Sequence, residues 1–122
     1  MRVKDGSVNV SDLHPKMLFL LPWLDDWWLR NFGYEVIITS ACDGQHKTGS
    51  RHYSGCAVDC RTWTSAQSGE QVNDAHRAEL SDLLRSDLDR AFPGAYHLFA
   101  HSTHFHVAFK PADRAITWST LI

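Results

Sequence analysis

The sequence predicts a single α+β domain in which helices flank a small, mostly antiparallel sheet. Two long stretches, 12–33 and 71–91, repeat apolar residues at helical spacing. Four shorter stretches are rich in β-branched and aromatic residues, as strands are: 34–39, 57–62, 96–99 and 103–109. The resulting order of helix, strand, loop, strand, helix, strand, strand is typical of an α+β fold.

Composition is consistent with one compact domain spanning residues 1–122. The chain is 43% hydrophobic and 21% charged, so it can build an ordinary core. The net charge is −2, and no basic stripe indicates nucleic acid. We therefore expect a monomer without a nucleic-acid partner.

The start of the chain resembles neither a signal peptide nor a membrane span. It carries no long apolar run and no small-residue cleavage site. The apolar run 17–24 is short, contains Pro22 and leads into Asp25 and Asp26. We expect synthesis in the cytosol without a signal peptide.

The first helix should begin near Ser11 or Asp12, which can cap it, with Pro15 in its first turn. Pro22 should kink the helix or split it, and Gly33 should end it. Its tryptophans are expected in the core, with the wall of a substrate cleft as the alternative: Trp23, Trp27 and Trp28.

The strand 57–62 separates two sets of side chains by its alternation. Asp59 shares one face with Ala57 and Arg61, whereas Cys56 and Cys60 point to the other face, toward the core. The chain has three cysteines and no C-x-x-C motif, which argues against a disulfide framework. The cysteines, Cys42 included, are therefore expected to be neither ligands nor catalytic groups.

The second helix, 71–91, should end at Pro93-Gly94, and the last two strands should meet in a tight turn near His101-Ser102. Of the chain's eight histidines, we expect three to be surface or core-edge residues: His14, His76 and His97. His104 and His106 differ, because residues two apart on a strand share a face and can reach one site.

A mixed imidazole and carboxylate set emerges when these histidines are combined with His52 and Asp59. His52 lies in the loop before the strand of Asp59, seven positions upstream. Imidazoles with one carboxylate suit zinc, and three protein ligands leave a fourth position open for water. The spacing thus indicates a catalytic metal site.

These residues resemble the zinc D-Ala-D-Ala carboxypeptidases and dipeptidases of the peptidase M15 type, which include phage endolysins. The signature S-x-H-x-x-G-x-A-x-D is complete here in Ser50, His52, Gly55, Ala57 and Asp59. A second, weaker signature is His104-Phe105-His106-Val107. The resemblance spans 36–109 and implies the fold shared by the D-Ala-D-Ala peptidases, lysostaphin-like enzymes and the hedgehog domain.

The resemblance implies zinc ligands and catalytic groups at particular positions. The zinc (Zn²⁺) ligands would be His52, Asp59 and His106. The usual acidic general base is replaced by Thr103, so His104 or His101 would take that role.

The family's oxyanion-stabilising Arg is absent after Thr39-Ser40. The residue that stabilises the oxyanion in its place would come from the loop that follows Thr39-Ser40, and it would be His46, Gln45 or Arg51. Ser50 would orient Asp59 or the substrate.

The implied activity is zinc-dependent hydrolysis of a bacterial peptidoglycan stem peptide. The bond would be D-Ala-D-Ala, as in a carboxypeptidase, or L-Ala-D-Glu, as in an endopeptidase. The enzyme would act at the cell wall as a phage or prophage hydrolase. The alternatives are a zinc-binding module that has lost catalysis and a structural phage protein in which the metal staples the fold.

Overall fold

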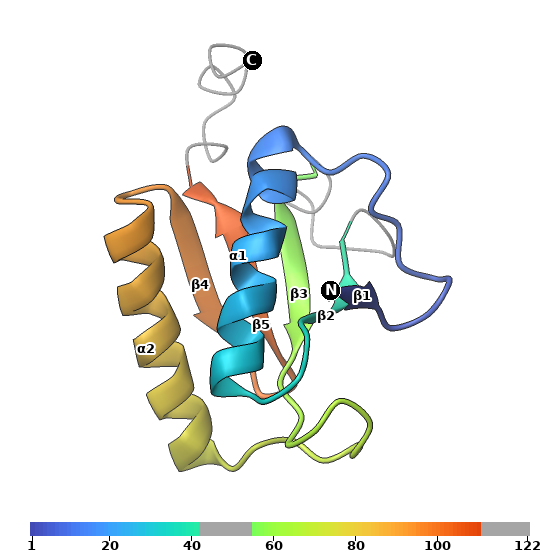
Figure 1. The fold of residues 1–122 in the computed structure, drawn as a ribbon, viewed down its shortest axis with the longest axis vertical. Coiled ribbons are helices and arrows are strands. Elements are labelled where there is room, and N and C mark those ends of the chain that lie inside the picture. The colour runs from blue at the N-terminus through green and yellow to red at the C-terminus, as the bar shows by residue number, and fades with distance from the viewer. Residues whose placement is uncertain (42–54, 111–122) are drawn as a thin grey trace.

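The computed structural model describes residues 1–41 and 55–110, and these form an α+β fold of two helices and a five-stranded open sheet (Figure 1). The elements in chain order are β1 (Arg2–Val3), α1 (Pro15–Asn31), β2 (Ile37–Ser40), β3 (Ala57–Arg61), α2 (Asp74–Ala91), β4 (Tyr96–Ala100) and β5 (His104–Phe109). The strand order is β1-β2-β3-β5-β4, and all pairs are antiparallel except β1 with β2. The predicted α+β class and mostly antiparallel sheet are confirmed.

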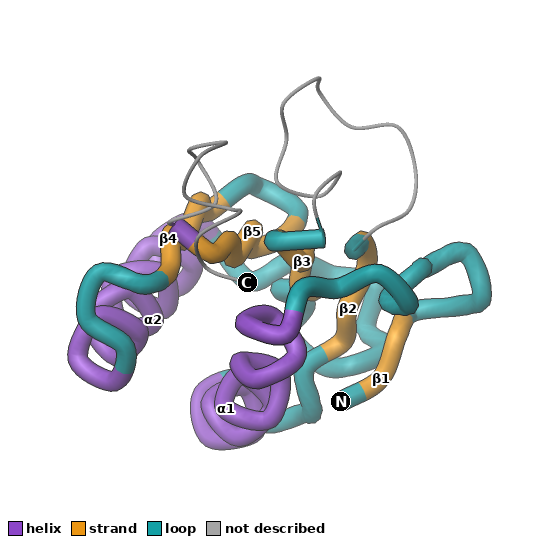
Figure 2. Tube along the Cα trace, turned by 90° about the horizontal axis from the view of Figure 1, so that it is seen from above, coloured by secondary structure: helices purple, strands orange, loops and turns teal. Residues whose placement is uncertain are grey.

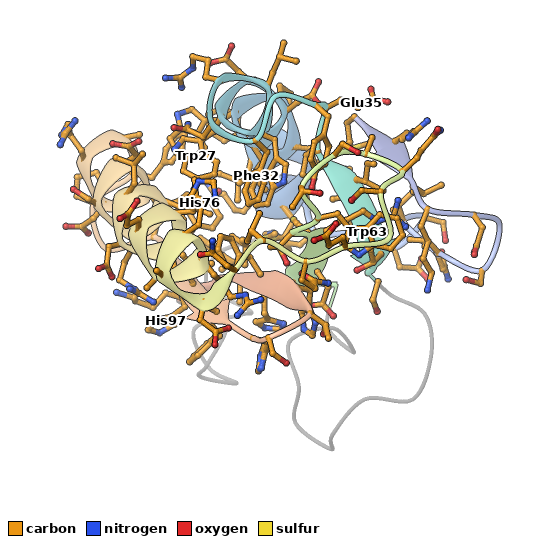
Figure 3. The ribbon with its side chains drawn as sticks, turned by 90° about the horizontal axis from the view of Figure 1, so that it is seen from below. Trp27, Phe32, Glu35, Trp63, His76 and His97 are labelled. Carbon is orange, nitrogen blue, oxygen red and sulfur yellow. The ribbon has the colours of Figure 1, made fainter. Side chains whose placement is uncertain are left out.

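Both helices lie on the same face of the sheet, so the described part of the chain has two layers (Figures 1 and 2). The core fills the space between them, and Figure 3 shows Trp27 and Phe32 there. Trp27 and Trp28 are fully buried and meet edge to face. Their predicted core role is confirmed, while Trp23 packs half-buried at the edge of the cluster.

Helix α1 starts later than predicted and is not split. His14, rather than Ser11 or Asp12, is its N-cap, because the Nδ1 atom of His14 accepts the Lys16 N–H at 3.1 Å. The helix continues through Pro22, which is exposed, so the carbonyl that loses its partner lies on the solvent side. Gly33 follows the helix with a positive φ of 84°, as predicted for its end.

The remaining elements lie close to their predicted positions. Helix α2 begins at Asp74 with Asn73 as its cap, three residues after the predicted start. The strand predicted at 34–39 is observed at Ile37–Ser40. Strand β1 was not predicted, because two residues are too short to show a period; it is held by pairing with β2.

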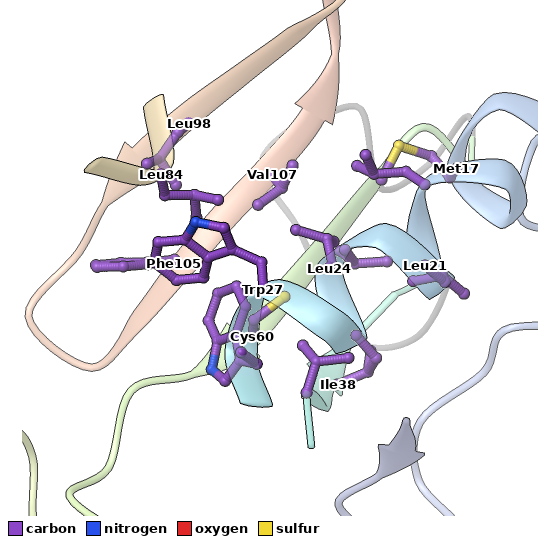
Figure 4. Packing of buried hydrophobic residues seen from close by; sticks show 14 of the residues in the cluster. Met17, Leu21, Leu24, Trp27, Ile38, Cys60, Leu84, Leu98, Phe105 and Val107 are labelled. Carbon is purple, nitrogen blue, oxygen red and sulfur yellow. The ribbon is translucent and has the colours of Figure 1, made fainter. Parts of the chain in front are cut away.

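The predicted alternation along β3 is confirmed. Cys56, Val58 and Cys60 are buried in the hydrophobic core, and Figure 4 shows Cys60 close to Trp27 and Ile38. Burial raises the pKa of the Cys60 thiol well above its usual value, so this thiol stays protonated and unreactive. Asp59 therefore lies on the face that the helices leave uncovered.

Candidate functional site

The candidate site occupies the two central strands, on the sheet face opposite the helices. Asp59 of β3 lies directly across from His106 of β5, and Arg61 lies across from His104. Because the side-chain period of a strand is two, Asp59, His104 and His106 project from the same face. Two central strands thus fix the positions of three of the predicted site residues.

The side chains of these three residues converge on one oxygen. The Oδ1 atom of Asp59 lies 2.9 Å from Nδ1 of His106 and 3.7 Å from Nε2 of His104. The side chains of Asp59, His106 and His104 are 12%, 15% and 28% exposed, respectively. The site is therefore largely desolvated at the carboxylate and open to solvent at His104.

Thr103 contacts the far side of the His104 ring. Its Oγ1 atom lies 2.9 Å from Nδ1 of His104, which leaves Nε2 directed toward Asp59. In the family that this sequence resembles, the position of Thr103 carries an acidic general base. Here its hydroxyl orients a neighbouring imidazole instead.

A ring cluster extends the site toward the edge strand β4. Phe99 pairs with His106 across the strands, their ring centroids are 5.8 Å apart, and Phe99 is 46% exposed. His101, in the turn after β4, is exposed and stacks on His104 with centroids 4.7 Å apart. His101 therefore lies beside the site, as a residue predicted to be catalytic must.

The other lone histidines are accounted for by structure. His14 caps α1 and stacks on Phe109, and burial lowers its pKa. His76 is exposed on α2, and His97 is half-buried with its ring 5.7 Å from Phe99. The expectation that His14 and His76 lie at the core edge or in solvent is confirmed.

The strand of Asp59 is held along its β2 side and at its N-terminal end. On its β2 side, a bulge shifts the register so that Ser40 lies opposite Asp59, and the Thr39 hydroxyl donates to the Asp59 carbonyl at 3.3 Å. Bulges are common where a sheet must aim a side chain into a site. On its N-terminal side, Gly55 accepts the His14 N–H at 2.9 Å, which ties β3 to the start of α1.

Six residues singled out from the sequence lie outside the described residues. They are the predicted ligand His52, the predicted catalytic or substrate-binding residues Gln45, His46, Ser50 and Arg51, and the predicted inert Cys42. Their roles stay predictions. The structure brings together the remaining four, His101, His104, His106 and Asp59.

The Asp59 carboxylate and the His106 imidazole are donor types that suit zinc. Zinc takes carboxylate oxygen at about 2.0–2.2 Å and imidazole nitrogen at about 2.0–2.1 Å, so two tetrahedral ligand atoms lie about 3.3 Å apart. Asp59 Oδ1 and His106 Nδ1 are closer than that, at the hydrogen-bond distance of 2.9 Å. Within residues 1–41 and 55–110, no group of three or more His, Cys, Asp or Glu side chains is arranged to hold a metal, and the predicted third ligand, His52, lies outside these ranges.

Sequence reasoning missed two residues that shape the site. Thr103 was considered only as a missing base, although a hydroxyl next to a histidine is a common way to fix its ring. Arg61 was placed on the correct face, but its guanidinium is held elsewhere, 3.7 Å above the Trp63 ring and 2.9 Å from the Ala66 carbonyl oxygen. Only the three-dimensional path of the 63–66 loop determines that contact.

Comparison with known proteins adds no family: no protein-family model, curated protein or solved structure matches this chain. In the described part of the chain, neither helix combines the length and apolar character needed to cross a membrane.

Proposed function

We propose that this protein is a zinc-dependent peptidase that cleaves bacterial peptidoglycan peptides, with a fold of the hedgehog and D-Ala-D-Ala peptidase type. The observation that carries the proposal is the pairing of Asp59 with His106 across two central strands, with His104 beside them. These residues belong to two separate sequence signatures, 47 positions apart, yet they meet at one oxygen atom. Such convergence supports a shared chemical role.

The residues divide into ligands and proton-handling groups. His52, Asp59 and His106 would hold zinc, which polarises a carbonyl and acidifies water in such sites. The Asp59 carboxylate would offset part of the positive charge of the metal. His104, the most exposed of the three described side chains, presents Nε2 where it can hold or transfer a proton to the leaving amine.

The surroundings suit a short peptide with small side chains. The site lies on the sheet face opposite the helices, where Phe99 gives an exposed apolar surface beside His106. Either a D-Ala-D-Ala end or an L-Ala-D-Glu stem bond would present a methyl group to such a surface. The resemblance of the two sequence signatures implies a peptidoglycan stem peptide as the substrate, and we propose a phage or prophage wall hydrolase as the biological role.

Thr103 favours a second candidate, a zinc-binding module of the same fold without catalysis. A hydroxyl at the position of the usual acidic base cannot accept a proton at neutral pH. In that case zinc would stabilise the protein or a structural phage assembly, and His104 would have no turnover to support.

Mass analysis of peptidoglycan fragments separates these candidates. The zinc-loaded protein is expected to release peptide or D-alanine products, and a chelator should abolish the release. A protein that binds one zinc per chain, loses thermal stability on chelation and releases no fragments would establish the binding module instead. The mass of the released fragments also identifies the bond that is cleaved.

A further inference from the structure

A series of hydrogen bonds runs from Thr62, the residue after β3, to the candidate site. Thr62, fully buried, donates its hydroxyl to Oε1 of Gln71 at 2.6 Å. The Nε2 atom of Gln71 then donates to the Thr103 carbonyl at 3.0 Å. The Thr103 hydroxyl completes the series at Nδ1 of His104, 2.9 Å away.

The backbone around Gln71 makes this series rigid. Residue 71 forms a β-bridge with Trp63, and two further backbone bonds flank it: Val72 N–H to the Thr62 carbonyl at 3.1 Å and Thr64 N–H to the Glu70 carbonyl at 2.8 Å. Gln71 is thereby fixed to the continuation of β3. Its amide reaches across to the turn that precedes β5, and so ties that turn to the sheet.

The contacts at His104 also set the direction of its ring. The Thr103 hydroxyl lies 2.9 Å from Nδ1 on one side of the ring. On the other side, Nε2 faces Asp59 Oδ1 at 3.7 Å.

We infer that Gln71 and Thr103 are positioning residues that fix the orientation of the His104 ring, with Nε2 directed into the site. The inference rests on the proposed function for its kinetic consequence, but the contacts that hold the ring do not depend on that function. Thr103 thus replaces the missing acidic residue in a different way: it prepares a histidine instead of acting as the base.

Nitrogen-15 NMR of the His104 ring in the full-length protein tests the inference directly, because the Nδ1 shift responds to loss of the contact with the Thr103 hydroxyl. Thr103→Val removes the hydroxyl at nearly constant shape, and Thr103→Ser restores it. Gln71→Glu keeps the acceptor for Thr62 but turns the donor facing the Thr103 carbonyl into an acceptor. Gln67→Glu, in the same exposed loop, adds the same charge away from the series and serves as the control.

The Nδ1 shift of His104 should move in Thr103→Val and move in the same direction in Gln71→Glu, while Thr103→Ser and Gln67→Glu stay like wild type. The kcat of peptide hydrolysis should fall about three- to tenfold in Thr103→Val, which corresponds to the loss of one hydrogen bond, and KM should change little. Unchanged wild-type shifts in Thr103→Val or in Gln71→Glu would overturn the inference. If the shifts move as expected but the wild type hydrolyses nothing, the positioning role stands and the peptidase proposal falls.

Discussion

At the scale of single residues, Asp59 is the group on which the site depends. Its carboxylate is nearly buried, and two imidazoles face one of its oxygens. A buried carboxylate needs compensation by hydrogen bonds or positive charge. His106 provides a hydrogen bond at 2.9 Å, and a bound cation would compensate the charge more fully.

Metal content should distinguish the ligands from the proton-handling group. We expect one zinc per chain in the wild type and a large loss in His52→Ala, Asp59→Ala and His106→Ala. His104→Ala should keep zinc and lose about 10²–10⁴-fold in hydrolysis, the usual worth of a positioned acid–base group. Elemental analysis and turnover measured on the same samples check both statements.

Two results would revise these roles. If His104→Ala loses zinc while His106→Ala keeps it, the two histidines exchange assignments. If His104→Ala keeps full activity, the proton-handling group lies elsewhere, and His101, stacked on His104, is the next residue to change.

The sequence was sufficient to place His104 with His106 on one side of a strand, and Asp59 opposite Cys56 and Cys60 on another, because parity within a strand depends on spacing alone. That the two sets share one face of the sheet follows from the register of β3 with β5. The sequence could not reveal that Thr103 contacts His104 or that Gln71 reaches Thr103. Those contacts depend on how a loop 32 positions earlier in the chain folds back over the turn. Residue type and spacing carry no such information.

At the scale of elements, Gly55 joins α1 to the site strand. Its φ is +74°, and a Cβ placed on it would lie 2.2 Å from the Asp12 carbonyl oxygen. Two independent reasons therefore require glycine here: the left-handed backbone and the close approach of another backbone segment. The Gly of the signature is explained by packing at the entrance to β3.

Gly55→Ala should destabilise the protein by about 2–5 kcal/mol, since a left-handed alanine costs about 1–2 kcal/mol and a backbone clash adds about 1–3 kcal/mol. Gly69→Ala and Gly94→Ala are matched controls: both have a similar positive φ, but a Cβ there meets nothing within 4 Å. These two control variants should lose only the contribution of the left-handed backbone, about 1–2 kcal/mol. Urea denaturation of the three variants measures the difference, and equal losses in all three would refute the packing argument.

Element type was predictable where the apolar period was long, but the boundaries were set by contacts that sequence does not show. The start of α1 moved to His14 because that imidazole accepts the Lys16 N–H and its backbone N–H bonds to Gly55. Ser11, the predicted cap, instead bonds to Asn9. A histidine cap is uncommon, and tertiary contacts selected it here.

At the scale of the whole molecule, one buried and one partly buried tyrosine make the free energy of unfolding depend on pH in the alkaline range. Burial raises the pKa of Tyr34 and Tyr96 to about 12 each. The Tyr34 hydroxyl donates to the Trp63 carbonyl at 2.9 Å, and the Tyr96 hydroxyl donates to the Lys16 carbonyl at 2.7 Å. These bonds link the helix layer and the loops to the sheet.

The sign of the effect follows from the raised values. Between the unfolded pKa of about 10 and the folded value, the native state binds more protons than the unfolded state, so the free energy of unfolding falls as pH rises. For Tyr34 alone the slope approaches about 1.4 kcal/mol per pH unit at most. Below pH 10 this contribution is constant.

Tyr34→Phe should weaken this alkaline decline, although it loses about 1 kcal/mol at neutral pH with its hydrogen bond. Urea midpoints measured at pH 8 and pH 11 for both proteins give the comparison. Identical pH slopes in the variant and the wild type would show that Tyr34 does not carry the effect.

The one-sided cover of the sheet has a consequence for how this chain tolerates change. Along β3 and β5, every second side chain enters the core under the helices, and the residues between them lie on the opposite face of the sheet. That face carries Asp59, His104 and His106, and also the fully buried Ala57 and Ala108. Substitutions of the core residues should therefore unfold the protein, whereas substitutions of Asp59, His104 or His106 should leave it folded and change metal binding or turnover. The two requirements fall on separate residues, so this face can acquire new chemistry while the layer beneath it continues to specify the same fold.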